Sequence, residues 1–193
     1  HLPLSPAFQE LLKLSASAAG RKVSSRVLRL SIHKMAKKYI LAERLSDDVH
    51  GLKRMWKKGY TTSFDILGEA TLTKGEAMNY IEEYGSMITL LHSLHHMEKT
   101  PWGEVCGNLS IKCTALVPHM RPIHHDESVR RLCEVLKPLM IQAKEHGVFI
   151  NIDMEQFDFH PIIFEAFSTC ISSDELKDCP HFGIVVQGYT LDS

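Results

Sequence analysis

The 193-residue sequence predicts an α/β fold with a parallel sheet, of the (β/α) barrel type. Four apolar runs of strand length begin near residues 63, 108, 148 and 182, and each interval between them holds a stretch with helical spacing. Strands and helices that alternate in this way are typical of βαβ units. The runs also alternate apolar with polar residues, whereas a sheet covered by helices on both faces is apolar on both. A barrel explains this pattern, because helices cover its outside and its strands face a lumen.

The chain is expected to begin with helices and to continue as a barrel. Residues 1–60 are predicted to form a helical segment that leads into the barrel, and residues 61–193 to form the barrel part. Ser5 followed by Pro6 is typical of a helix start. Apolar residues at three- and four-residue steps then predict a helix over about 21–45.

Helix boundaries after residue 60 are marked by capping residues. Thr73 and Glu76 form a T-x-x-E capping box, which predicts the start of a helix. Asp126 begins the next helical pattern, and Gly147 is the glycine that typically ends such a helix. A third helix is expected over about 161–171.

Charged and amide side chains fall on the polar face of the predicted strands. They are Asp65 and Glu69 on the first strand, Lys112 on the second, Asp153 on the third and Gln187 on the fourth. All except Asp65 lie in the second half of their strands, where the active site of a barrel lies. A satisfied polar layer inside a filled barrel is the structural alternative. Lys112 together with Asp153 disfavours that alternative, because removing a charge from water is costly unless a partner or ligand compensates.

Composition and charge argue against several classes of protein, namely nucleic-acid-binding, lipid-binding, membrane-spanning and secreted proteins. The chain has 22 basic and 23 acidic residues, a balance that provides no footprint for nucleic acid or anionic lipid. Its five cysteines include no CxxC pair, which suits a reducing compartment. No apolar run approaches the roughly 20 residues of a membrane span, and no signal peptide is visible. We therefore expect a cytoplasmic protein that does not bind nucleic acid.

Motifs for metals and nucleotides are incomplete. His92, His95 and His96 share one face of a predicted helix, but no cysteine or carboxylate completes a ligand set, so no metal site is predicted. The sequence contains no GxGxxG, GxxxxGK[ST] or HExxH motif, so nothing in it indicates a Rossmann or P-loop nucleotide-binding site.

The strands resemble those of the proline dehydrogenase family, most closely the proline dehydrogenase part of bifunctional bacterial proline-utilisation flavoenzymes. The matching stretches are "FDILGEA", "SIKCTAL", "NIDME" and "VVQGY", in the family's order and spacing. The family has a first strand ending in LGE, a Ser-x-Lys strand, an Asp-x-Glu-Glu strand and a strand ending in Gln-Ala-Tyr. The resemblance covers about residues 62–191. It implies a (β/α)8 TIM-type barrel of which this chain supplies about the first four βα units.

The same resemblance implies a reaction and its partners. A member of this family would oxidise L-proline to Δ1-pyrroline-5-carboxylate by passing a hydride to N5 of FAD. The reduced FAD would then pass electrons to a quinone. A downstream aldehyde dehydrogenase domain, a homo-oligomeric state and peripheral contact with the inner face of the membrane are also implied.

Site roles carry over from the family residue by residue. Lys112 matches the lysine that pairs with the proline carboxylate, and Asp65 and Glu69 match acidic positions near that pocket. Asp153 matches the active-site aspartate. The positions that contact flavin are Met154 and Gln187.

The sequence also departs from the family. Cys113-Thr114 stands where Leu-Ser is usual, Gln156 replaces the second acid, and Gly188 replaces an alanine. The chain stops at "TLDS", before the strands that carry the family's flavin-binding arginine and lysine and the helix with its carboxylate-binding arginines. We therefore expect a fragment that is inactive by itself.

Two other functions fit the same residues. A barrel aldolase would use Lys112 as its Schiff-base nucleophile, with Asp153 or Glu69 as proton shuttle. An inactive barrel kept for interaction would retain these residues without chemistry. Flavin binding by the full-length protein separates the dehydrogenase from both alternatives.

Overall fold

The computed structural model describes residues 25–32, 35, 49–68, 70–101 and 103–189. The chain divides into two units, His1–Lys58 and Gly59–Ser193. In the first unit, residues 25–32 and α3 (Val49–Lys57) are helical. The predicted helix start at Ser5 and Pro6 lies outside the described residues.

The second unit is built on a parallel four-stranded sheet with the order β1-β4-β5-β6. Each neighbouring pair of strands is parallel, as the alternation of strands and helices predicted. The strands are β1 (Ser63–Asp65), β4 (Asn108–Lys112), β5 (Phe149–Asp153) and β6 (Phe182–Ile184).

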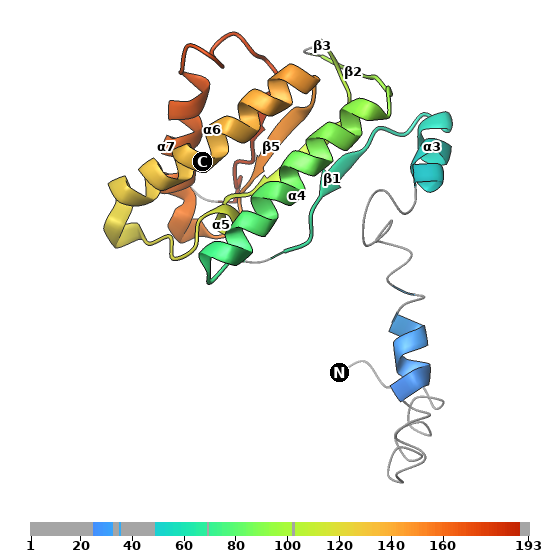
Figure 1. Ribbon diagram of the computed structural model, residues 1–193, viewed down its shortest axis with the longest axis horizontal. Helices are drawn as coiled ribbons and strands as arrows, with labels where there is room; N and C mark the ends of the chain where they lie inside the picture. Colours follow the sequence, from blue (N-terminus) through green and yellow to red (C-terminus); the bar gives the residue numbers. More distant parts are fainter. Residues whose placement is uncertain (1–24, 33–34, 36–48, 69, 102, 190–193) are drawn as a thin grey trace. The chain divides into compact units, whose positions relative to one another are not determined.

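Three long helices connect these strands (Figure 1). They are α4 (Lys74–Ser93), α6 (His125–His146) and α7 (His160–Ile171). Helix α6 packs against α4, α7 and β5. In Figure 1, α4 and α6 lie side by side across the strands. The third helix begins one residue before the predicted range and ends where the sequence placed its end.

The predicted caps set the ends of these helices. Thr73 accepts a hydrogen bond from the N–H of Glu76, whose carboxylate accepts one from the N–H of Thr73, so the capping box is complete. Gly147 ends α6 with φ 67°, in the left-handed region that glycine adopts without strain. Helix α6 starts at His125, one residue before the predicted Asp126, and follows the short 3-10 turn η2 (Pro122–His124).

The core lies between the helices and the apolar face of the sheet. Leu109 is opposite Ile150 and Ile111 is opposite Ile152, and all four side chains are fully buried. Burying one such side chain contributes about 1.5–3 kcal/mol. The alternation of apolar and polar residues therefore fixes which face of β4 and β5 meets the helices and which face carries the polar groups.

The structure corrects two details of the predicted strands. The second strand ends at Lys112, and Cys113–Leu116 forms the short helix α5, although the alternation of "NLSIKCTAL" predicted a longer strand. An unpredicted antiparallel hairpin, β2 (Glu98–Thr100) with β3 (Gly103–Val105), precedes β4. Glu98 fixes this hairpin to the start of β1 by accepting hydrogen bonds from the N–H and hydroxyl of Thr62, each 3.0 Å long.

Two further features complete the description of the fold. The 3-10 turn η3 (Phe157–Phe159) leads from the end of β5 into α7. Within the described ranges, no helix combines the length and the apolar character that a membrane crossing requires.

Candidate active site

The polar groups gather on one face of the sheet, at the carboxyl ends of β4 and β5. Asp65 is opposite Ser110 in the register of β1 and β4, and Ser110 is opposite Asn151 in that of β4 and β5. Lys112 and Asp153 form the next opposed pair, two residues further along. Side chains two apart on a strand share a face, and opposed residues of parallel strands point the same way. All five side chains therefore lie on the face opposite the apolar core.

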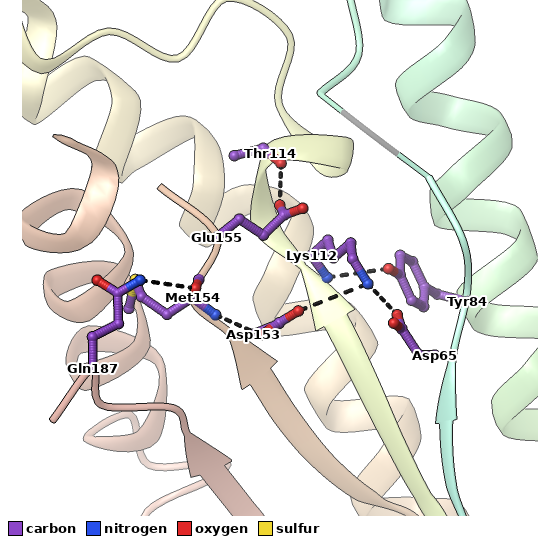
Figure 2. Close-up of polar contacts among 8 residues, drawn as sticks. All are labelled: Asp65, Tyr84, Lys112, Thr114, Asp153, Met154, Glu155 and Gln187. Carbon is purple, nitrogen blue, oxygen red and sulfur yellow. Dashed lines mark hydrogen bonds and ion pairs between the residues drawn. The ribbon is translucent and has the colours of Figure 1, made fainter. Parts of the chain in front are cut away.

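Lys112 is the centre of this group (Figure 2). Its Nζ forms an ion pair with Oδ1 of Asp65 and lies 3.7 Å from Oδ2 of Asp153. The lysine side chain is only 11% exposed, while those of Asp65 and Asp153 are 46% and 33% exposed. A nearly buried ammonium is thus compensated by two carboxylates that solvent or a ligand can reach.

A tyrosine from α4 supports the backbone of Lys112. The backbone N–H of Lys112 donates to the phenol oxygen of Tyr84 at 3.1 Å, in a buried setting. Burial raises the pKa of Tyr84 well above its ordinary value, with a smaller opposite effect from the bond to Lys112. The phenol therefore stays neutral and can both accept and donate a hydrogen bond.

The end of β5 is fixed by three hydrogen bonds around Met154. Its N–H donates to Oδ1 of Asp153 at 2.9 Å, and its carbonyl accepts from Nε2 of Gln187 at 3.3 Å. The next residue, Glu155, accepts a hydrogen bond from the hydroxyl of Thr114 on α5. Figure 2 shows these contacts beside the lysine cluster, so Gln187 and Asp153 are held on either side of one backbone segment.

Cys113 follows Lys112 but faces the protein interior. Its side chain is buried, and burial raises the pKa of its thiol, with smaller contributions from Cys170, Glu155 and Asp153. A buried thiol with a raised pKa is a poor nucleophile. The cysteine that replaces the usual family residue is therefore a packing residue.

The structure brings most of the sequence-predicted site residues together. Asp65, Lys112 and Asp153 form one ion-pair cluster, and Met154 and Gln187 lie beside it (Figure 2). Gln187 follows β6 by three residues instead of lying within a strand, since β6 ends at Ile184. The remaining predicted residue, Glu69, lies outside the described residues.

Sequence reasoning missed two supporting contacts. Tyr84 lies in a helix whose pattern indicates only core packing, so nothing distinguished its hydroxyl from that of any buried tyrosine. The bond between Thr114 and Glu155 joins residues 41 positions apart and has no local sequence pattern.

The sequence placed His92, His95 and His96 on one helix face, but only His92 lies in α4, since the helix ends at Ser93 and the other two follow it. Nδ1 of His92 donates to the carbonyl of His146 at 3.0 Å, which joins the carboxyl ends of α4 and α6. In the part of the chain that the structure describes, no group of three or more His, Cys, Asp or Glu side chains is placed to hold a metal ion.

Comparison with known proteins decides the family. The model of the family described as Proline dehydrogenase matches residues 49–193, which is more than half of the chain. The chain belongs to the proline dehydrogenase family. Within this family, the predicted resemblance to the proline dehydrogenase part of bifunctional enzymes is confirmed by curated relatives and by solved structures.

Curated relatives of the chain include two kinds of protein. The Bifunctional protein PutA of Escherichia coli (strain K12) is 26% identical over an alignment of 189 residues, and the match covers 96% of this chain and 14% of the relative. Proline dehydrogenase 1 of Bacillus subtilis subsp. natto is 23% identical over 154 residues, which make up 80% of this chain and 44% of the relative. The chain thus spans about a seventh of the PutA protein's length.

Solved structures confirm the α/β fold with its parallel sheet and helices. Proline utilization A (PutA) from Bdellovibrio bacteriovorus, crystallised after inactivation by N-propargylglycine, matches with a TM-score of 0.82 and 33% identity. That match covers 91% of this chain and 19% of the other. A mutant PutA from Bradyrhizobium japonicum matches with a TM-score of 0.61 over 69% of this chain, at 27% identity.

Proposed function

We propose that the full-length protein oxidises L-proline to Δ1-pyrroline-5-carboxylate with FAD as the hydride acceptor. The observation that carries this proposal is the nearly buried Lys112, held between Asp65 and Asp153 at the ends of β1, β4 and β5. Family membership supports the oxidation of proline as the reaction. The roles of the individual residues are inferred from their positions and chemistry.

The charges of the cluster suit an amino acid as substrate. L-Proline carries one carboxylate and one ring ammonium, and the cluster offers one cation and two anions. We assign the substrate carboxylate to Nζ of Lys112, because a lysine ammonium is a compact point charge with three donors. Asp153 is the acidic group on the far side of the lysine from Asp65, and its exposed fraction leaves it accessible to the ring nitrogen. Glu69 is proposed as a further acidic residue of this pocket.

The residues at the end of β5 fit a flavin ring. When bound, FAD would accept the hydride at N5. The amide of Gln187 can donate and accept, as the edge of an isoalloxazine ring requires, and its bond to the carbonyl of Met154 fixes its orientation. Met154 offers a polarisable thioether next to Asp153. These two residues would hold the ring, while Lys112 and Asp153 bind and orient the substrate.

The rest of the barrel and its partners are proposed for the full-length protein. In the described sheet, β1 and β6 each pair on one side only. We infer that further strands close the sheet into a (β/α)8 barrel and supply the cations for the FAD pyrophosphate. Relatives named Bifunctional protein PutA support a second dehydrogenase domain in the same chain. A quinone acceptor and a homo-oligomeric state complete the proposal.

The aldolase hypothesis is weaker because of the charges around Lys112. Schiff-base formation needs a neutral amine as nucleophile. The Nζ of Lys112 is instead engaged in ion pairs with two carboxylates. Borohydride trapping of a keto substrate on Lys112 is therefore not expected.

Turnover by the purified full-length protein tests the proposal. L-Proline with an artificial electron acceptor should reduce the acceptor, and o-aminobenzaldehyde should detect the cyclic imine product. D-Proline and L-pipecolate serve as matched substrates that change chirality or ring size. Full-length protein that binds FAD but forms no imine would contradict the assigned substrate, and protein that binds neither FAD nor proline would support the inactive barrel.

A further inference from the structure

Lys112 lies just beyond the part of β4 that pairs with β1. The ladder between β1 and β4 ends with Asp65 opposite Ser110. On its other side, Lys112 still faces Asp153 of β5 within the sheet. The N–H of Lys112 is bonded to the phenol oxygen of Tyr84, so a helix side chain provides a partner where β1 no longer does.

The surroundings of Tyr84 hold its side chain in place, so its hydroxyl can fix the backbone of Lys112. Its side chain is fully buried, and α4 packs against α6 and α5. Tyr80, one turn earlier on α4, packs so closely on the segment after β1 that any side-chain carbon at Gly68 would collide with its phenol. Tyr80 therefore contacts the segment that follows β1, and Tyr84 contacts the end of β4.

The position of the lysine ammonium depends on this backbone support. A lysine side chain has several rotatable bonds, so its Nζ is located only by its ion pairs and by where its backbone is fixed. Asp65 provides the ion pair, and Tyr84 and β5 fix the backbone from two sides. A shift of about 1 Å in such a group is enough to weaken binding at a site.

We propose that Tyr84 is a positioning residue that sets the affinity of the site for the substrate carboxylate through Lys112. The inference deepens the proposed function and rests on it, because it takes Lys112 as the carboxylate anchor. It assigns Tyr84 no contact with the substrate. Its effect should therefore appear only with ligands that carry a carboxylate, and only while Lys112 is present.

The test compares wild type, Tyr84→Phe, Lys112→Met and the double variant in the full-length flavin-containing protein. Tyr84→Phe removes the hydroxyl and keeps the ring, so the Lys112 anchor should shift and the KM for L-proline should rise about tenfold, while kcat stays within about twofold. Competitive inhibition by a carboxylate without an amine should weaken in parallel. Pyrrolidine, which lacks the carboxylate, should bind both proteins equally.

The double variant separates positioning from general damage. If Tyr84 acts through Lys112, adding Tyr84→Phe to Lys112→Met should leave proline binding unchanged, so the two effects are not additive. Equal losses for proline and pyrrolidine, or a tenfold loss that persists without Lys112, would overturn the proposal. Tyr60→Phe is the control, because the side chain of Tyr60 is exposed and is not part of the described cluster.

A second measurement does not depend on the variant folding. In wild-type full-length protein, the amide hydrogen of Lys112 should exchange slowly with deuterium, since it is buried and bonded to Tyr84. Rapid exchange at Lys112 beside slow exchange at Ile111 would overturn the proposal. Should wild-type protein fail to oxidise proline while binding it through Lys112, the proposed function fails and the positioning role stands.

Discussion

Lys112 and Asp153 occupy directly opposed positions at the ends of β4 and β5, with Nζ 3.7 Å from Oδ2. Because the two strands are parallel, this places a cation and an anion at the same edge of the sheet, where ligands of α/β barrels bind. Asp65 approaches the same ammonium from β1. The pair is thus a product of strand register, and its consequences can be tested.

Lys112→Met should remove most of the affinity for proline. The variant leaves Asp65 and Asp153 facing each other without their shared cation. Losing one partner of a nearly buried charge pair costs at least about 2–5 kcal/mol, so kcat/KM for proline should fall by about a hundredfold or more. Steady-state kinetics of the full-length protein measures this. Lys137→Met is the matched control, because Lys137 pairs with Glu175 on an exposed surface; an equal loss there would refute the assignment.

Thr114→Val should loosen the connection between α5 and the end of β5. Valine keeps the shape of threonine but cannot donate to Glu155, and one such hydrogen bond contributes about 1 kcal/mol. Thr114→Ser keeps the hydroxyl and should retain the stability. Urea unfolding of the full-length protein, followed by flavin fluorescence, compares the two. Equal midpoints for the valine and serine variants would show that the bond contributes nothing.

Thr73→Ala should destabilise the first turn of α4. The variant removes the side-chain acceptor for the N–H of Glu76, at a cost of about 1 kcal/mol. The effect should be local, so amide exchange near the start of α4 should accelerate about fivefold while exchange in α6 stays constant. Unchanged exchange at residues 76–77 would contradict the capping role.

Stability should fall at alkaline pH partly through Cys113. Burial raises the pKa of this thiol in the folded state above its ordinary value of about 8.5. As the pH rises, the thiol therefore loses its proton in the unfolded chain before it does so in the folded protein. The contribution of the thiol to the free energy of unfolding is fully present below about pH 8.5 and declines above it. Urea midpoints at pH 7.5, 8.5 and 9.5 should decline less steeply for Cys113→Ala than for wild type. Parallel declines would exclude Cys113 as the cause.

Local patterns predicted the fold class and several boundaries. The capping box at Thr73 and the glycine at Gly147 depend on a few neighbouring residues, and both are observed. The alternation in β4 and β5 placed Lys112 and Asp153 on the polar face. This could be predicted because successive side chains of a strand point to opposite faces, so the face of each residue follows from its position in the sequence. Their closeness also required that the two strands be neighbours in the observed register.

Other features depend on contacts that the sequence does not display. The alternation of β4 continues through Ala115, yet the chain turns into α5 after Lys112. The turn is accompanied by the bond between Thr114 and Glu155, which are 41 positions apart. The hairpin of β2 and β3 has strands of three residues each, too short for periodicity to detect.

The visible spectrum of the full-length protein tests the central claim most directly. The account predicts flavin absorbance in the purified protein, and bleaching of that absorbance when L-proline is added without oxygen. Lys112→Met should keep the flavin bands and lose the bleaching at the same proline concentration, because Lys112 is assigned to the substrate and not to the flavin. A folded full-length protein without flavin bands, or with bands that proline does not bleach, would contradict the account.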